Sequence, residues 1–152
     1  DFLPKVSGRF YIGAVSIEYT GAQDRSDSDV IAGGAIIWAV HERLSVESKI
    51  NRDIYFSPGG AVTTRSTVAF AANQQLIGGF SVTGEIEGSR AEHEQQNSLR
   101  RDHTVNLRTG IKYALTDRFS FSAACTLTNQ ESDEAFYDYD RALVSGHIFC
   151  RF

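Results

Sequence analysis

Methionine is absent from this 152-residue sequence, and there are only two prolines and two cysteines. The two cysteines are too few for a disulfide scaffold: they form one bridge or remain thiols, and neither belongs to a metal-binding pattern. No run approaches about 18 consecutive apolar residues, so no transmembrane helix is predicted. The net charge of -4 excludes the basic surface of a nucleic-acid-binding protein. We therefore expect no metal, cofactor or nucleic acid.

The composition is that of a folded chain rich in strands. Apolar residues make up 41% of the sequence and aromatic residues 11%. This content is too high for a disordered polar tail, and the length suits one domain over residues 1–152. A chain that begins Asp1-Phe2 without methionine is typical of a processed, exported product, and a trimmed chain would look the same.

Apolar and polar residues alternate with a period of two through most of the chain. In residues 119–128, the odd positions from Phe119 to Leu127 are apolar, and the even positions from Ser120 to Thr128 are small or polar. A helix would not keep these faces apart, because its side chains turn by about 100° per residue. We expect eight β-strands, at about residues 8–20, 29–40, 43–54, 63–72, 77–88, 103–115, 119–129 and 141–152.

Each expected strand has one face that is more apolar than the other. In the first strand we assign Tyr11, Val15 and Ile17 to the apolar face, which puts Glu18 on the polar face. The second strand is the least regular, because small and apolar residues occupy both of its faces.

The connections between the strands alternate between short and long. Short polar connections lie at 41–43, 73–76 and 116–118, and longer ones at about 21–28, 55–62, 89–102 and 130–140. In an antiparallel up-and-down arrangement, all short turns lie at one end of the sheet and all long loops at the other.

An even number of antiparallel strands with short turns at one end is typical of a transmembrane β-barrel. Strands of about 10–13 residues are long enough to cross a bilayer at a tilt. Such a sheet has to close, because unpaired backbone groups at an edge are costly in hydrocarbon. We therefore predict an all-β, eight-stranded antiparallel up-and-down transmembrane β-barrel with short periplasmic turns and long extracellular loops.

The last residues resemble the terminal strand of bacterial outer-membrane proteins. Every second position before the final residue, Phe152, carries in turn Cys150, Ile148, Gly146 and Val144. In those proteins the barrel-assembly machinery recognises a terminal aromatic residue, although an aromatic or large aliphatic residue is more usual at the position of Cys150. The pattern of nearly the whole chain is similar to the small OmpA/OmpX-type barrels. This resemblance implies a bacterial outer-membrane location, surrounded by membrane lipid and lipopolysaccharide.

If the apolar faces meet lipid, the polar faces line a narrow interior that carries charges of both signs. Unpaired charges are costly in such a space, so we expect ion pairs that fill an eight-stranded barrel. A narrow pore gated by one of these pairs is the alternative. The residues of this expected interior charge network are Glu18, Glu47, Lys49, Arg65, Glu85, Arg108 and Lys112.

The last long connection is acidic and aromatic. It contains Phe136, Tyr137 and Tyr139, and because aromatic residues are enriched at interfaces, we expect them to contact a surface ligand or host protein. The spacing of the acidic residues is not that of an EF-hand, so we predict no metal here. The arginines of the 89–102 connection suited to lipopolysaccharide phosphates are Arg90, Arg100 and Arg101.

We expect no enzyme. A hydrolase needs a nucleophile, a His base and an acid that orients the base. His103 follows Asp102 near the expected outer leaflet, but no Ser stands at a suitable spacing on the same strand, and the His-x-Ser arrangement of a lipid A deacylase is missing. A polar residue at the membrane interface is the simpler interpretation of His103.

The sequence thus predicts a non-enzymatic outer-membrane barrel with a structural role and with adhesion or ligand contact through its long loops. A narrow channel for small solutes or ions is the first alternative. A soluble lipocalin-like carrier is the second, because residues 8–11 are similar to a lipocalin's first strand and alternation alone does not tell inside from outside. A lipid A-modifying enzyme is the last alternative.

Overall fold

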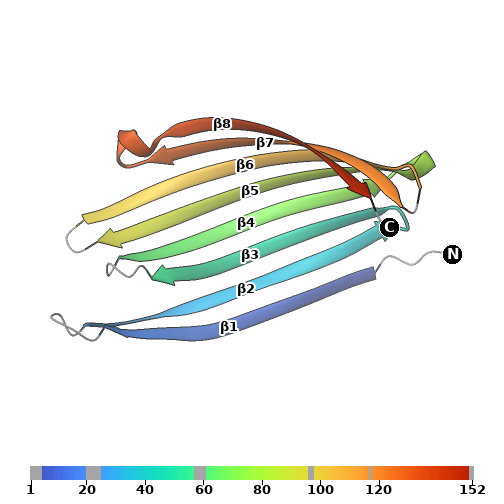
Figure 1. Cartoon of the computed structure of the whole chain (residues 1–152). Coiled ribbons are helices and arrows are strands. Elements are labelled where there is room, and N and C mark those ends of the chain that lie inside the picture. Colours follow the sequence, from blue (N-terminus) through green and yellow to red (C-terminus); the bar gives the residue numbers. More distant parts are fainter. Residues whose placement is uncertain (1–4, 20–24, 57–60, 96–97, 117, 151–152) are drawn as a thin grey trace.

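The computed structural model describes residues 5–19, 25–56, 61–95, 98–116 and 118–150. In this part of the chain, eight strands form one sheet in the order β1 to β8, and all neighbours are antiparallel (Figure 1). The predicted all-β, up-and-down topology is confirmed. The strands are β1 (Lys5–Tyr19), β2 (Arg25–His41), β3 (Leu44–Phe56), β4 (Val62–Gln75), β5 (Phe80–Gln95), β6 (Ser98–Ala114), β7 (Phe119–Ser132) and β8 (Tyr139–Cys150).

The strands extend further into the long connections than expected. The pairing of β5 with β6 continues to Gln95 and Ser98, and β4 pairs with β5 as far as Glu94, so most of the predicted 89–102 loop belongs to the sheet. β7 continues to Ser132, and a short 3-10 helix, η2 (Ala135–Tyr137), leads into β8. The reason is that a backbone ladder needs no apolar side chains, so polar residues on both faces continue the pairing.

β1 and β8 are the two edges of the curved sheet (Figure 1). Among the described residues, no pairing joins these two strands. Their apolar side chains are also the most open of any in the strands: Ile12 of β1 is 80% exposed and Val144 of β8 is 77% exposed. Within the described residues, one side of each edge strand therefore has unpaired backbone groups, and several of its apolar side chains are largely exposed.

The register sorts the side chains of the sheet onto two faces. One face, called the apolar face below, carries most of the large apolar side chains, including Phe10, Ile36, Ile50, Val68, Phe70, Ile86, Val105, Leu107 and Leu127. The opposite, polar face carries all seven side chains that are nearly inaccessible in the described residues. These are Ala35, Ala69, Ser89, Ala91, Asp102, Thr104 and Thr128.

The face assigned to β1 from the sequence was wrong. Phe10 and Ile12 pair with Gly34 and Ala32 on the apolar face, so Tyr11 lies on the polar face. The same alternation puts Glu18 on the apolar side, opposite to its expected place in the interior charge network. Both faces of this strand contain large apolar residues, so only its pairing with β2 decides which face joins the apolar face of the sheet.

Two glycines of β2 make room for aromatic rings of β1. A Cβ atom at Gly34 would lie 2.4 Å from Cδ1 of Phe10, and one at Gly33 would lie 2.6 Å from Cε1 of Tyr11. The two rings therefore cover the two glycines from opposite faces of the sheet.

The Gly34→Ala substitution should push the Phe10 ring out of place and lower the free energy of unfolding by about 1–3 kcal/mol. Urea titration of the refolded protein in detergent micelles measures this change. Gly84→Ala is the matched control, because a Cβ at Gly84 meets nothing within 4 Å. A Gly34→Ala protein as stable as the Gly84→Ala protein would contradict this packing.

The two cysteines are free thiols. Cys125 is paired with Val144 of β8, whereas Cys150 lies six positions further along that strand, opposite Phe119. Six residues of strand span about 20 Å, which is beyond the reach of a disulfide. No helix in the described residues is long and apolar enough to cross a membrane.

Candidate functional site

Charged side chains of β3, β5 and β6 line the polar face nearest the short turns. Nζ of Lys49 lies 3.0 Å from Oε2 of Glu47, and Nη1 of Arg108 lies 3.4 Å from Oε2 of Glu85. Ala71 of β4 stands in register between the two glutamates, and its small side chain leaves space between the two ion pairs. A hollow of about 390 Å³ is lined by Glu47, Ala71, Glu85 and Arg108 together with apolar and polar neighbours, among them Ile37 and Asn73.

The structure places six of the seven residues of the expected charge network on the polar face. Besides the two ion pairs, this face carries Arg65, in register with Asp53, and Lys112, in register with Ser122. The described residues show no ion pair for either of these two cations. The seventh residue, Glu18, lies on the opposite face.

A chain of hydrogen bonds crosses the middle of the polar face. Nδ2 of Asn106 donates to Oε1 of Glu87 at 3.1 Å, and Oγ1 of Thr128 donates to Oδ1 of Asn106 at 2.8 Å. The chain links β5, β6 and β7 and satisfies polar groups that are only partly open to solvent.

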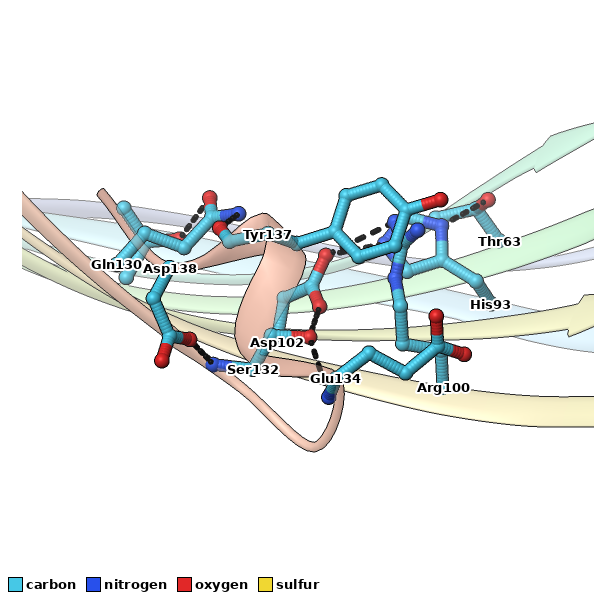
Figure 2. A network of polar contacts seen from close by, with 10 residues as sticks. Thr63, His93, Arg100, Asp102, Gln130, Ser132, Glu134, Tyr137 and Asp138 are labelled. Atoms are coloured by element: carbon cyan, nitrogen blue, oxygen red, sulfur yellow. Dashed lines mark hydrogen bonds and ion pairs between the residues drawn. The ribbon is translucent and has the colours of Figure 1, made fainter.

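Asp102 is the centre of a second cluster, near the loop end of the polar face (Figure 2). Its Oδ2 lies 3.0 Å from Nε2 of His93 and 3.1 Å from Nη2 of Arg100, and its Oδ1 accepts a 2.6 Å hydrogen bond from Oγ of Ser132. The Asp102 side chain is only 7% exposed. A carboxylate with this little solvent needs such partners, because an unpaired buried charge is costly.

Asp102 lies in the part of β6 that extends beyond the apolar band, since its two neighbours on the apolar face are Arg101 and His103. Burial favours the neutral form of Asp102, but the hydrogen bond from Ser132 and the charges of Arg100 and His93 outweigh it. The pKa of Asp102 is therefore lowered from its ordinary value of 3.8.

The connection between β7 and β8 folds over this cluster. The Tyr137 ring packs on Arg100, whose guanidinium carbon lies 3.7 Å from the ring centroid (Figure 2). Nε2 of Gln130 donates to the backbone oxygen of Tyr137 at 3.1 Å, and Oδ1 of Asp138 accepts from the backbone N–H of Ser132 at 2.7 Å. These contacts fix η2 against the polar face.

The three aromatic residues expected to contact a ligand therefore differ in their surroundings. Phe136 is 91% exposed at the tip of the connection. Tyr137 is engaged by Arg100, and Tyr139 is the first residue of β8, on the polar face opposite Gln130. Only Phe136 is fully presented to solvent.

The cluster contains a hydroxyl, an imidazole and a carboxylate in a row. Oγ1 of Thr63 lies 3.0 Å from Nδ1 of His93, whose Nε2 faces Asp102. This is the order of groups in acyl-transfer enzymes. Here Asp102 also lies 3.1 Å from Nη2 of Arg100. The contacts of this cluster join β4, β5, β6 and β7, and Nε of Arg100 is a buried atom without a hydrogen-bond partner in the described residues.

Sequence reasoning missed this cluster because it assigned His93 and Arg100 to a loop. A signal was present: the alternation continues through Ser89, Ala91 and His93 with small and polar residues. His103, the residue considered for catalysis, lies on the apolar face opposite Glu131, away from the cluster. No group of three or more potential metal ligands is found in the described part of the chain.

Comparison with known proteins agrees with this arrangement of strands and faces. No curated protein and no solved structure matches the chain. A family model described as "Putative beta-barrel porin 2" matches residues 1–151. An eight-stranded up-and-down sheet with one apolar and one polar face is what a wall of such a barrel requires. The chain therefore belongs to this family of β-barrel porins.

Proposed function

We propose that this chain forms the wall of a bacterial outer-membrane channel, with the apolar face against lipid and the polar face lining the water-filled lumen. The observation that carries the proposal is the charged hollow between Glu47, Glu85 and Arg108, on the face opposite the apolar band. Charges of both signs along a lumen suit small polar solutes or ions. Membership of a porin family supports the same function.

Aromatic residues near the short turns support a membrane position. Phe80 and Tyr113 stack on the apolar face with ring centroids 4.2 Å apart, and Phe121 follows Tyr113 in register. Such rings are enriched where a barrel wall leaves hydrocarbon. Phe152, the residue expected to be recognised by the barrel-assembly machinery, lies outside the described residues.

The proposal requires partner strands for both edges of the sheet. Backbone groups of β1 and β8 without partners would be costly in hydrocarbon. Closure with eight strands leaves an interior filled by side chains, whereas a larger barrel leaves an aqueous channel. The conductance of the assembled protein therefore reports both the function and the size of the barrel.

The direct test is reconstitution of the refolded protein into a planar lipid bilayer. We expect stepwise, voltage-independent conductance, and cold SDS electrophoresis should show a species whose mobility changes on boiling. A heat-modifiable protein with no conductance would indicate a barrel whose interior is filled by side chains, and it would contradict the proposed channel. A protein that stays β-rich and monodisperse in plain buffer would contradict the membrane location as well.

The Glu47→Gln, Glu85→Gln double variant should move the ion selectivity of the channel toward anions by about threefold or more. The reason is that two lumen carboxylates are lost while Lys49 and Arg108 keep their charges. Reversal potentials in a salt gradient measure the change. Glu18→Gln is the control, since it removes one carboxylate from the opposite face; an equal shift in both proteins would contradict the assignment of the lumen.

Adhesion through the β7–β8 connection is a second candidate function, favoured by the exposure of Phe136. Phe136→Ser should weaken binding to a surface ligand or host protein by about tenfold while leaving conductance unchanged, because exposed aromatic anchors often dominate such contacts. Binding of whole cells to immobilised host proteins measures this. Unchanged adhesion in the variant would contradict binding through the β7–β8 connection.

A further inference from the structure

A row of basic side chains, interrupted by one serine, borders the apolar face on its loop side. Arg52 of β3, Ser66 of β4, Arg90 of β5 and His103 of β6 stand in register across four neighbouring strands. Arg101 is the next residue of β6 on the same face toward the loops, and it is paired with Glu92 of β5. Next to this row, on the side of the short turns, the apolar face carries Ile50, Val68 and Val105.

A groove of about 800 Å³ runs along this border. Its lining includes Phe10, Ile50, Val68 and Val105 from the apolar face, and Arg52, Arg90 and His103 from the basic row. Residues of the intervening positions, such as Gly33 and Ser89, also line it. Both positions are directed toward the polar face, so these residues contribute backbone atoms to the floor of the groove. The groove therefore joins an apolar wall to a cationic wall.

The two principal cations of the row are separate and accessible. Arg52 and Arg90 are two strands apart, which corresponds to about 10 Å between their backbones. Nη2 of Arg52 lies 3.0 Å from Oδ2 of Asp29, and Nη2 of Arg90 lies 2.6 Å from Oε1 of Glu92, so the two guanidiniums turn toward different carboxylates. Their side chains remain 45% and 50% exposed. Nε of Arg52 also donates to the backbone oxygen of Val30 at 3.3 Å, and the exposed part of each guanidinium can donate to a separate anionic group.

We propose that this groove binds a bisphosphorylated glycolipid of the surrounding leaflet. One phosphate lies at Arg52, the other at Arg90 and His103, and the acyl chains run along the apolar wall. Two phosphates at the ends of a sugar headgroup suit two arginines whose strands lie about 10 Å apart, whereas a lipid with one phosphate engages only one of them. The inference uses the face opposite the lumen and rests on the proposed membrane location.

This site differs from the arginines that the sequence had suggested for phosphate binding. Arg90 belongs to the row, and Arg101 lies beside it, 3.4 Å from Oε1 of Glu92. Arg100 points to the polar face, where it holds Asp102. In the proposed site Arg100 is therefore replaced by Arg52, which lies on β3 and is distant from Arg90 in the sequence.

The experiment measures lipid retained by the refolded wild-type protein in zwitterionic micelles, using native mass spectrometry. The probes are diphosphoryl lipid A, monophosphoryl lipid A and phosphatidylglycerol. We expect the wild type to bind diphosphoryl lipid A about tenfold or more tightly than either of the others. Arg52→Gln, Arg90→Gln should lose this preference. The matched control, Arg65→Gln, Arg141→Gln, removes two arginines from the polar face and should keep it.

Equal binding of all three lipids by the wild type, or an unchanged preference in the Arg52→Gln, Arg90→Gln protein, would overturn the inference. Conductance and heat modifiability of each variant are recorded in parallel. A wild type that conducts but shows no lipid preference refutes the lipid site alone. A wild type that folds in plain buffer without micelles refutes the proposed channel, and the lipid site falls with it.

Discussion

Asp102→Ala is expected to destabilise the folded sheet more than any other substitution on the polar face, by about 3 kcal/mol. The change removes the common partner of His93, Arg100 and Ser132. It leaves the largely buried guanidinium of Arg100 without its counter-charge, and that uncompensated charge accounts for most of the cost. Urea unfolding in micelles, followed by tryptophan fluorescence, measures the loss.

The pH dependence of the same measurement separates charge from packing. Because the pKa of Asp102 is lowered in the folded state, its contribution is complete above the ordinary value of 3.8 and is lost as the pH falls through the lower folded value. Asp102→Asn keeps the size of the side chain but not the charge. The wild type should therefore lose its advantage over Asp102→Asn only below about pH 4; a constant difference down to pH 2 would contradict the ion-pair account.

The fixed β7–β8 connection gives this prediction a second readout. Tyr137 rests on Arg100, so releasing Arg100 should also release η2 from the polar face. In Asp102→Ala, limited proteolysis should cut the 133–138 connection faster than in the wild type. Asp53→Ala, also on the polar face but on β3, is the control and should leave this cleavage unchanged.

The second large effect is expected from Leu107→Arg, at the centre of the apolar face. If this face meets lipid, an arginine there should cost about 2–4 kcal/mol in a bilayer. Leu107→Ala measures the part that comes from the lost side chain alone. The difference between the two variants, measured by urea-dependent folding into lipid vesicles, is the cost of the charge. Equal costs would show that Leu107 does not meet hydrocarbon.

Ala71→Arg is the corresponding control on the polar face. Ala71 stands in register between Glu47 and Glu85, so an arginine there lies beside two carboxylates. Folding should be little affected, because the new charge stays on the polar face and does not enter hydrocarbon. Conductance should fall, since the longer side chain occupies the hollow between the two ion pairs. A severe loss of folding in this control would contradict the assignment of a polar lumen.

The sequence alone determined the class of the fold, the number of strands and the faces of most of them. Strands such as β6 and β7 have one clearly apolar face, and a period of two has a direct physical cause in the alternating direction of side chains along an extended backbone. The short connections predicted the antiparallel order, because a turn of a few residues joins only adjacent antiparallel strands. The polar-face placement of Glu47, Lys49, Glu85 and Arg108 followed from the same alternation.

Only the tertiary structure decided what depends on pairing between strands. β1 has large apolar residues on both faces, so its register with β2 determined that Phe10, and not Tyr11, joins the apolar face. The Asp102 cluster and the row of Arg52 and Arg90 each join residues from different strands, and no local pattern encodes that proximity. Alternation is a property of one strand, whereas a site is a property of several strands in register.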